Sequence, residues 1–205
     1  MNQNHTPYND RRRTAPTVIF DLDGTLLDTL QDLTAATNWA LRRHGFAQHS
    51  IDEVRMMVGN GVGKLIERAI PDGSSNPEYA GTLADFKGYY VGHCRDNTKP
   101  YAGIREMLME LKSGGWKTAI VSNKLQPGVT ELHEAFFKEL IDVAVGERQG
   151  LRCKPAPDMV EAALAELGAD SRRAVYVGDS DVDIATARAC GLPCISVTWG
   201  FRDRE

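Results

Sequence analysis

Four short apolar runs, each rich in β-branched side chains, stand out along the chain. They cover residues 17–20, 118–121, 174–177 and 194–197. Because the apolar residues in each run follow one another without alternation, the pattern predicts strands of a parallel sheet that are buried on both faces. Polar side chains directly follow each of the first three runs. The carboxyl ends of these strands are therefore the first place to expect chemistry.

Helical periodicity separates the runs. We expect helices over residues 104–112, 127–136, 158–167 and 182–190. Gly168 and Gly191 follow the last two segments and act as C-terminal stops. Alternation of strand and helix predicts an α/β fold with a doubly wound parallel sheet. In such sheets ligands bind beyond the carboxyl ends of the strands, where the polar clusters of this chain lie.

Residues 28–96 interrupt this alternation. Their pattern predicts successive helices at residues 28–44, 51–58, 62–70 and 78–94, and no strand. We therefore expect an inserted α-helical cap at residues 28–96, and a core domain formed by residues 17–27 and 97–205. Residues 1–16 are polar and predict a disordered tail.

Charge and composition narrow the function classes. The 205 residues carry 24 basic and 28 acidic side chains, a net charge of −4, and 42% of them are hydrophobic. This mixture excludes a wholly disordered chain, and nothing in it predicts a nucleic-acid partner. No run approaches the ~18 apolar residues of a membrane helix, and no apolar signal segment begins the chain. We expect a cytoplasmic monomer or homodimer that does not bind membranes, with its four cysteines reduced because they form no CxxC pair.

Three aspartates follow predicted strands. Asp21 and Asp23 are two residues apart, so in an extended segment both carboxylates point to the same side. Asp179 adds a third carboxylate from another strand end. Three converging acidic groups require a cation, and hard oxygen ligands around a phosphate favour Mg²⁺.

Groups suited to a phosphate lie beside these carboxylates. Gly24 offers a backbone N–H, Thr25 and Ser122 offer hydroxyls, and Lys154 offers a positive charge. Phosphoryl transfer depends mainly on positioning and on neutralising charge, and this set of residues provides both.

As a set, these residues resemble the haloacid dehalogenase-like superfamily. Its motifs match, in order, the segment Asp-Leu-Asp-Gly-Thr-Leu at residues 21–26, Ser122-Asn123, Lys154-Pro155, and Gly-Asp-Ser-Asp-Val-Asp at residues 178–183. The resemblance covers residues 17 to about 200. It implies a phosphatase in which Asp21 attacks phosphorus to form an aspartyl-phosphate, while Asp23 protonates the leaving oxygen and then activates water.

The resemblance also implies which residues bind phosphate and metal. The phosphate-binding residues would be Gly24, Thr25, Ser122, Asn123 and Lys154. Magnesium would be held by the Asp21 carboxylate, the Asp23 backbone carbonyl and Asp179. Asp183 would steady either Lys154 or a metal-bound water.

Further segments narrow the choice within the superfamily. Members that remove halogen need no second acid, so Asp23 favours a phosphatase. Residues 58–61, 65–69, 122–124 and 154–157 resemble the phosphoglycolate phosphatases, which implies 2-phosphoglycolate as the substrate. Pyrophosphatases and sugar-phosphate phosphatases or mutases with the same cap type are the alternatives.

Thr29 and Cys153 depart from the common pattern of the family. The sequence ends at Glu205, before the final helix that is usual in relatives, which suggests truncation.

A different class of function is a receiver-like binding protein that signals through a phosphorylated aspartate. Such a protein benefits from a long-lived acyl-phosphate. An acid/base at Asp23 would hasten hydrolysis of that group, so the sequence favours the enzyme.

A glycine-rich loop precedes the third cap helix. We propose four candidates for recognition of the leaving group: Asn60, Gly61, Lys64 and Arg68. Lys64 and Arg68 are four residues apart, so they share a helix face. A flexible connection between two helices explains the glycines equally well. The loop does not match a phosphate-binding P-loop, since Leu65 stands where Ser or Thr is required.

Two polar positions concern helix starts. Asp181 is expected to cap the helix that follows it. Asp28 and Thr29 either complete the first motif or cap the first helix of the insertion.

Overall fold

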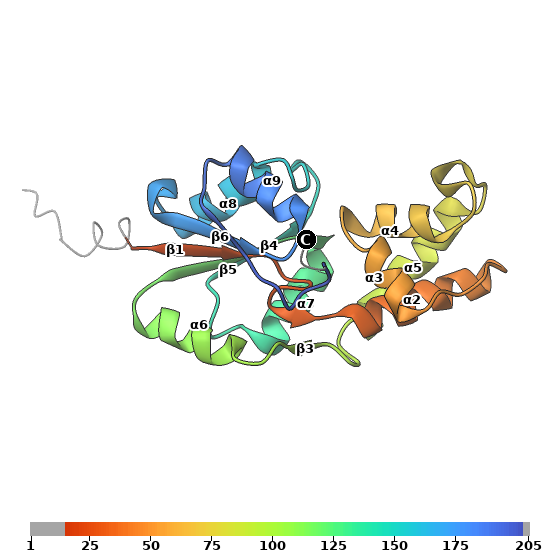
Figure 1. Cartoon of the computed structure of the whole chain (residues 1–205), viewed down its shortest axis with the longest axis horizontal. Helices are drawn as coiled ribbons and strands as arrows, with labels where there is room; N and C mark the ends of the chain where they lie inside the picture. Colours follow the sequence, from red (N-terminus) through yellow and green to blue (C-terminus); the bar gives the residue numbers. More distant parts are fainter. Residues whose placement is uncertain (1–14, 203–205) are drawn as a thin grey trace, which may run out of the picture.

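The computed structural model describes residues 15–202, and a five-stranded parallel sheet forms its centre (Figure 1). The order is β5-β4-β1-β6-β7. Its strands are β1 (Thr17–Phe20), β4 (Lys117–Leu125), β5 (Val143–Glu147), β6 (Ala174–Gly178) and β7 (Cys194–Ser196). The central strand β1 pairs along its whole length with β4 on one side and β6 on the other. The predicted α/β fold with a parallel sheet is confirmed.

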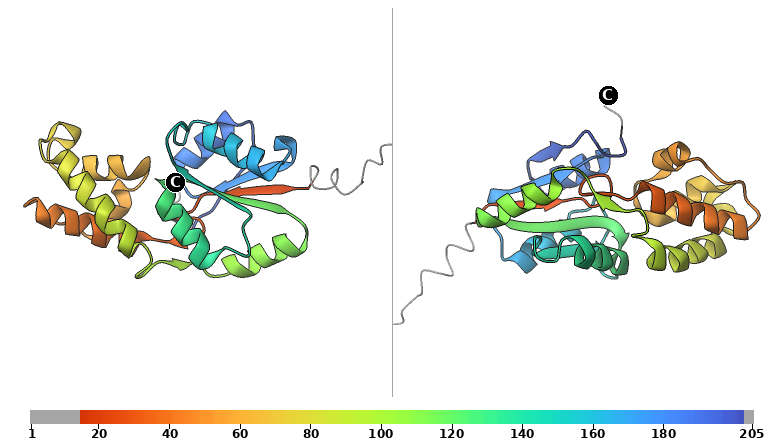
Figure 2. Two further views of the ribbon diagram at one scale, coloured as in Figure 1. Left: turned by 180° about the vertical axis from the view of Figure 1, so that it is seen from behind. Right: turned by 90° about the horizontal axis from the view of Figure 1, so that it is seen from below.

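Alternate residues of β1 supply two hydrophobic cores. Val18 and Phe20 belong to one buried cluster, whereas Ile19 belongs to another. The first cluster includes residues of α6 (Ile104–Ser113) and α7 (Gln126–Phe136); the second includes residues of α8 (Asp158–Leu167) and α9 (Asp181–Ala189). Figures 1 and 2 show these two helix pairs on opposite faces of the sheet. The unalternating apolar run is therefore explained by burial on both faces.

The sheet differs from the prediction at β4 and β5. The strand expected to end at Val121 continues to Leu125, where it pairs with Glu147 after an irregularity in register. Ser122 and Asn123 thus lie within β4 instead of after it. The sequence analysis missed β5 because its apolar part, residues 143–145, is short and is followed by Gly146 and Glu147.

The interrupting segment consists of helices, as its periodicity indicates. They are α2 (Leu30–Arg43), α3 (Ile51–Met57), α4 (Gly61–Ala69) and α5 (Tyr79–His93), with a short 3₁₀ helix at Gly73–Ser75. We call residues 30–93 the helical insertion. Figure 1 shows it beside the carboxyl edge of the sheet, away from the flanking helices of the core.

A two-stranded ribbon that was not predicted joins the helical insertion to the core. Strand β2 (Leu27–Asp28) pairs antiparallel with β3 (Lys99–Pro100), so that Asp28 lies in a strand and not in the first helix. The buried carboxylate of Asp32 binds across the two connections, accepting hydrogen bonds from the backbone N–H and side chain of both Asn97 and Thr98. The two ends of the insertion are thereby held together.

The predicted tail at residues 1–16 lies outside the described residues except for its last two. The Pro16 carbonyl accepts a hydrogen bond from the Lys117 N–H, at the start of the sheet. The end at Glu205 also lies outside them. Over residues 15–202, no helix combines the length and apolar character needed to cross a membrane.

Candidate active site

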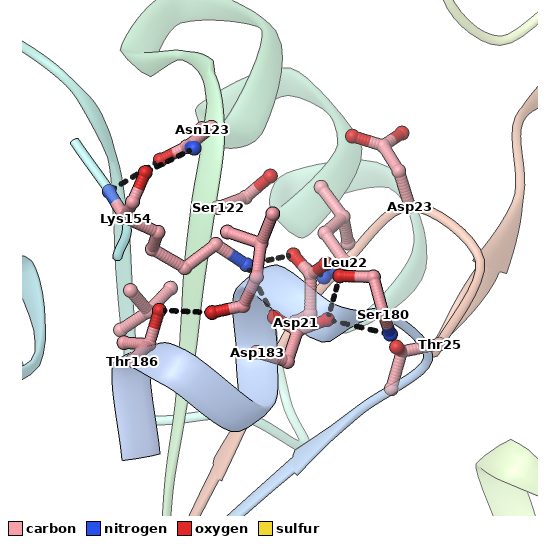
Figure 3. A network of polar contacts seen from close by, with 12 residues as sticks. Asp21, Leu22, Asp23, Thr25, Ser122, Asn123, Lys154, Ser180, Asp183 and Thr186 are labelled. Carbon is pink, nitrogen blue, oxygen red and sulfur yellow. Dashed lines mark hydrogen bonds and ion pairs between the residues drawn. The ribbon is translucent and has the colours of Figure 1, made fainter. Parts of the chain in front are cut away.

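An acidic cluster lies at the carboxyl ends of β1 and β6. Asp21 follows β1 directly, while Asp179 and Asp183 follow β6, and ligand oxygens of all three lie within 4.8 Å of one another. Figure 3 shows Asp21 and Asp183 side by side, with the Lys154 side chain reaching toward both. Adjacent parallel strands explain this meeting of residues about 160 positions apart.

Asp21 is held rigidly for a group at a strand end. Its backbone N–H donates to the Val177 carbonyl at 2.9 Å, and its carboxylate accepts from the Leu22 N–H at 2.7 Å. The Lys154 Nζ lies 2.9 Å from the same carboxylate oxygen. Burial raises the pKa of Asp21 well above its ordinary value, which Lys154 opposes and Asp183 reinforces. Lys154 is thus the cation paired with this buried carboxylate.

The donor set fits a magnesium ion. Burial also raises the pKa of Asp179, and the nearby Asp183 carboxylate adds to this effect. A Cβ at Gly24 would lie 2.4 Å from the Asp179 Oδ2, and one at Gly200 would lie 2.3 Å from its Cβ, so backbone without side chains surrounds this carboxylate. Hard oxygen donors in such a cradle suit Mg²⁺.

Lys154 is buried and has three polar partners. Its Nζ donates to Asp183 at 2.8 Å and to the Tyr176 hydroxyl at 3.1 Å, besides its pairing with Asp21. Asn123 binds the backbone of Lys154 twice, accepting from its N–H at 2.7 Å and donating to its carbonyl at 2.9 Å. The Asn123 side chain, predicted to bind phosphate, is instead occupied in fixing Lys154.

Asp183 is saturated by hydrogen bonds. One oxygen accepts from Lys154 and from Tyr176, and the other accepts from the Ser180 hydroxyl and N–H. Of its two predicted partners, Asp183 binds Lys154. Ser180 caps α9 together with Asp183, which corrects the expectation that Asp181 is the cap. The sequence analysis did not identify Tyr176 as part of the site. The only indication in the sequence was a residue with a hydroxyl group inside an otherwise apolar strand.

The remaining predicted phosphate ligands divide into two groups. Ser122 is buried and lines the cavity described below, and its hydroxyl accepts from the Lys124 N–H at 3.2 Å. Thr25 donates to Asp179 at 3.4 Å, and the Gly24 N–H donates to the Leu27 carbonyl at 2.9 Å. The structure therefore presents Ser122 to a ligand, whereas Gly24 and Thr25 support the turn and Asp179.

Asp23 lies in a second cluster that the sequence analysis did not identify. Its carboxylate accepts from the Thr29 hydroxyl at 2.6 Å and from Lys124 Nζ at 2.8 Å. Thr29 occupies the cap position of α2 but makes no capping bond with its side chain, because its hydroxyl is used on Asp23. In Figure 3 the Asp23 carboxylate points away from the Asp21–Lys154 network.

Lys124 connects Asp23 to the helical insertion. Its Nζ donates to the Tyr90 hydroxyl at 2.7 Å and lies 4.6 Å from the centroid of that ring. Its side chain is only 3% exposed. Burial alone would lower the pKa of Lys124, but Asp23 and Tyr90 raise it above its ordinary value, so the ammonium stays charged. A lysine directly after Ser122 and Asn123 was the available sequence signal.

A cavity of about 80 Å³ lies between the core and the helical insertion. Asp21, Asp23 and Lys124 line it from the core. Residues 58–62 and Leu65 line it from the insertion, which brings the predicted Asn60 and Gly61 to the site. This volume holds a handful of water molecules, so it suits a small ligand.

Lys64 and Arg68 do not line the cavity. Lys64 pairs with Glu67 at 2.8 Å and is 52% exposed. Arg68 donates to the carbonyls of Met57 and Gly59, at the end of α3. They share a helix face as expected, but α4 turns that face away from the core.

Arg202 lines the same cavity after the last strand of the sheet. Its guanidinium donates to the carbonyls of Arg55 and Val58 in the helical insertion. The Phe201 N–H just before it donates to Asp179 at 2.8 Å. This segment therefore links the acidic cluster to the insertion, although no sequence motif pointed to it.

Comparisons with known proteins agree with this geometry. The family model for haloacid dehalogenase-like hydrolases matches residues 18–197. A phosphoglycolate phosphatase of Caulobacter vibrioides is 35% identical over 91% of this chain and 81% of its own length, and one of Aquifex aeolicus is 33% identical over 90% and 85%. A crystal structure from Lactobacillus delbrueckii, provisionally named as a phosphoglycolate phosphatase, superposes with a TM-score of 0.88 at 36% identity, covering 93% of this chain and 89% of its own. With its acidic cluster in place and nearly its whole length matched, the chain belongs to the haloacid dehalogenase-like hydrolases.

Proposed function

We propose that this protein is a magnesium-dependent phosphatase that hydrolyses 2-phosphoglycolate through an aspartyl-phosphate on Asp21. One observation carries the proposal: the buried Asp21 faces Lys154 in a small cavity that also contains a second, separately held carboxylate, Asp23. A nucleophile and an acid/base with different surroundings are what stepwise phosphoryl transfer requires. The core of this enzyme is residues 17–27 and 97–205, and residues 28–96 are its cap.

Asp21 attacks phosphorus and becomes the acyl-phosphate. Lys154 and the Ser122 hydroxyl bind phosphoryl oxygens, with Lys154 fixed in place by Asn123 and Asp183. Magnesium would be held by the carboxylates of Asp21 and Asp179 and the backbone carbonyl of Asp23, and when bound it neutralises charge on the transferring group.

Asp23 serves both half-reactions. As an acid it gives its proton to the oxygen that leaves phosphorus, and as a base it then takes a proton from the water that attacks the acyl-phosphate. Its carboxylate must turn from Thr29 and Lys124 toward Asp21 to do so. Thr29 and Lys124 therefore define the resting position of this group.

The choice of 2-phosphoglycolate is supported by the relatives that carry that name and by the size of the cavity. It is tested with a panel of 2-phosphoglycolate, pyrophosphate, β-glucose 1-phosphate and p-nitrophenyl phosphate. Release of inorganic phosphate should be fastest from 2-phosphoglycolate.

Removal of magnesium should abolish this activity. We expect EDTA to reduce phosphate release to background, because the three clustered carboxylates then face a phosphate without a metal ion, and Lys154 is the cation paired with Asp21 and Asp183 in that cluster. Added Mg²⁺ should restore the rate in full. Undiminished hydrolysis after exhaustive chelation would rule out a magnesium enzyme.

Asp23→Asn should lower kcat by about 10²- to 10⁴-fold on an alkyl phosphate, because the amide cannot donate the proton. The loss should be much smaller on p-nitrophenyl phosphate, whose leaving group needs no proton. Steady-state kinetics on both esters check this. Equal losses on the two would be inconsistent with an acid at Asp23.

A further inference from the structure

Strand β4 divides the site into two levels. Lys124 follows Ser122 by two residues, in the part of β4 whose register with β5 is irregular. Ser122, Asn123 and Lys124 all line the cavity, and the Asn123 side chain also binds the backbone of Lys154. Lys124 therefore lies one step beyond Ser122, in the direction of the helical insertion that carries Tyr90.

The same two levels occur on the loop after β1. Asp21 pairs with Lys154 at the phosphoryl level, and Asp23 pairs with Lys124 at the next. In the proposed reaction Asp23 delivers a proton to the leaving oxygen, so Lys124, which holds Asp23 at rest and lines the same cavity, lies on the leaving-group side of the site.

Lys124 is also the available cation at this level. Lys154 is committed to Asp21 and Asp183, and Arg202 donates to carbonyls of the insertion. Within residues 15–202, the carboxylate paired with Lys124 is that of Asp23 alone.

This pairing cannot persist through the reaction. To act as an acid, Asp23 must take a proton from solvent and turn toward the leaving oxygen. The Lys124 ammonium then keeps the Tyr90 hydroxyl but loses its counter-ion, while it remains buried. A buried ammonium without an anion is strongly unfavourable. A negative charge on the leaving group would take the place of Asp23.

We propose that Lys124 is a specificity-determining residue that selects phosphate esters whose leaving group carries a carboxylate, with Tyr90 as the positioning residue that directs its ammonium. The inference rests on the proposed phosphatase function and identifies the Lys124 ammonium as the group that recognises the leaving group of the substrate. Because Tyr90 belongs to α5 and Lys124 to β4, this recognition needs the helical insertion and the core together.

The test compares 2-phosphoglycolate with its amide, phosphoglycolamide, which has the same size without the charge. The wild type should prefer the acid, as measured by kcat/KM. Lys124→Met should reduce that preference by on the order of 10- to 100-fold, the usual range for a hydrogen bond between charged groups. Activity on phosphoglycolamide should fall less than activity on the acid.

Two further variants separate specificity from structure. Tyr90→Phe keeps the ring and removes the hydroxyl, so it should raise KM for 2-phosphoglycolate several-fold with little change in kcat. Lys124→Gln keeps a donor for Asp23 and should lose the same preference if the methionine variant folds poorly. Lys138→Met is the matched control, because Lys138 is 60% exposed and pairs with Glu134 on the surface; it should change nothing.

The outcomes distinguish this inference from the proposed function. Magnesium-dependent hydrolysis with equal kcat/KM for acid and amide, or an unchanged preference in Lys124→Met and Lys124→Gln, would overturn the role of Lys124 and leave the phosphatase intact. If no ester is hydrolysed, the proposed function fails. Calorimetric titration of the full chain then decides the inference: tighter binding of 2-phosphoglycolate than of its amide, lost in Lys124→Gln, upholds it, and equal binding overturns it.

Discussion

Replacing Asp21 by Asn should lower kcat by at least about 10⁴-fold on every phosphate ester, because an amide of the same shape cannot form the acyl-phosphate. The substitution removes one of three clustered carboxylates, and burial raises the pKa values of Asp21 and Asp179. The free energy of unfolding should therefore not decrease. Phosphate release at saturating substrate measures the loss, and thermal unfolding followed by circular dichroism shows that the fold remains.

Asp181→Asn provides the matched control for this experiment. Asp181 lies in the same segment as Asp179 and Asp183 but is exposed at the start of α9. The same chemical change there should leave kcat within about twofold of the wild type. Wild-type turnover in Asp21→Asn would refute a nucleophile at this position.

The second large effect is expected for Lys154→Ala, which removes the ammonium between Asp21 and Asp183. Loss of a fixed donor to the transferring phosphoryl group typically costs about 10²- to 10³-fold in rate. Because the phosphoryl group is common to all substrates, kcat/KM should fall alike on 2-phosphoglycolate and p-nitrophenyl phosphate. A defect confined to one ester would place Lys154 in leaving-group recognition.

Lys154→Ala should also destabilise the protein. It leaves the fully buried Asp183 without its cation, and breaking a buried ion pair costs about 3 kcal/mol or more in the free energy of unfolding. Lys138→Ala, at an exposed pair, should cost less than about 1 kcal/mol. Urea denaturation at neutral pH compares the two variants.

The parts of the fold visible in the sequence were those with strong local signals. The apolar run of β1 predicted a strand buried on both faces, because burial of that kind excludes polar residues from a strand. The carboxylates after it predicted an acidic cluster, but Asp183 joins Asp21 and Asp179 there in place of the Asp23 carboxylate. Strand β5 had no such signal, since only residues 143–145 are apolar. The ribbon of β2 and β3 was not predicted, because strands of two residues are too short to show a periodic pattern.

The site was predictable where it follows a motif and unpredictable where it depends on orientation. Lys64 and Arg68 were correctly placed on one helix face, but periodicity does not say which way α4 presents that face to the core. Lys124 and Tyr90 are 34 residues apart and on different bodies of the fold, so only the packing of the helical insertion against β4 could reveal their contact.

The ribbon of β2 and β3 gives the helical insertion a particular mechanical freedom. Its two connections to the core are paired with each other, and Asp32 binds the returning one through Asn97 and Thr98. Two separate connections would allow the insertion to twist, slide and tilt relative to the core. Two connections that are paired as a ribbon move together and bend mainly in one direction. We therefore expect any movement of the insertion to be mainly a rotation about this ribbon, and such a rotation would change the distance between Tyr90 and Lys124.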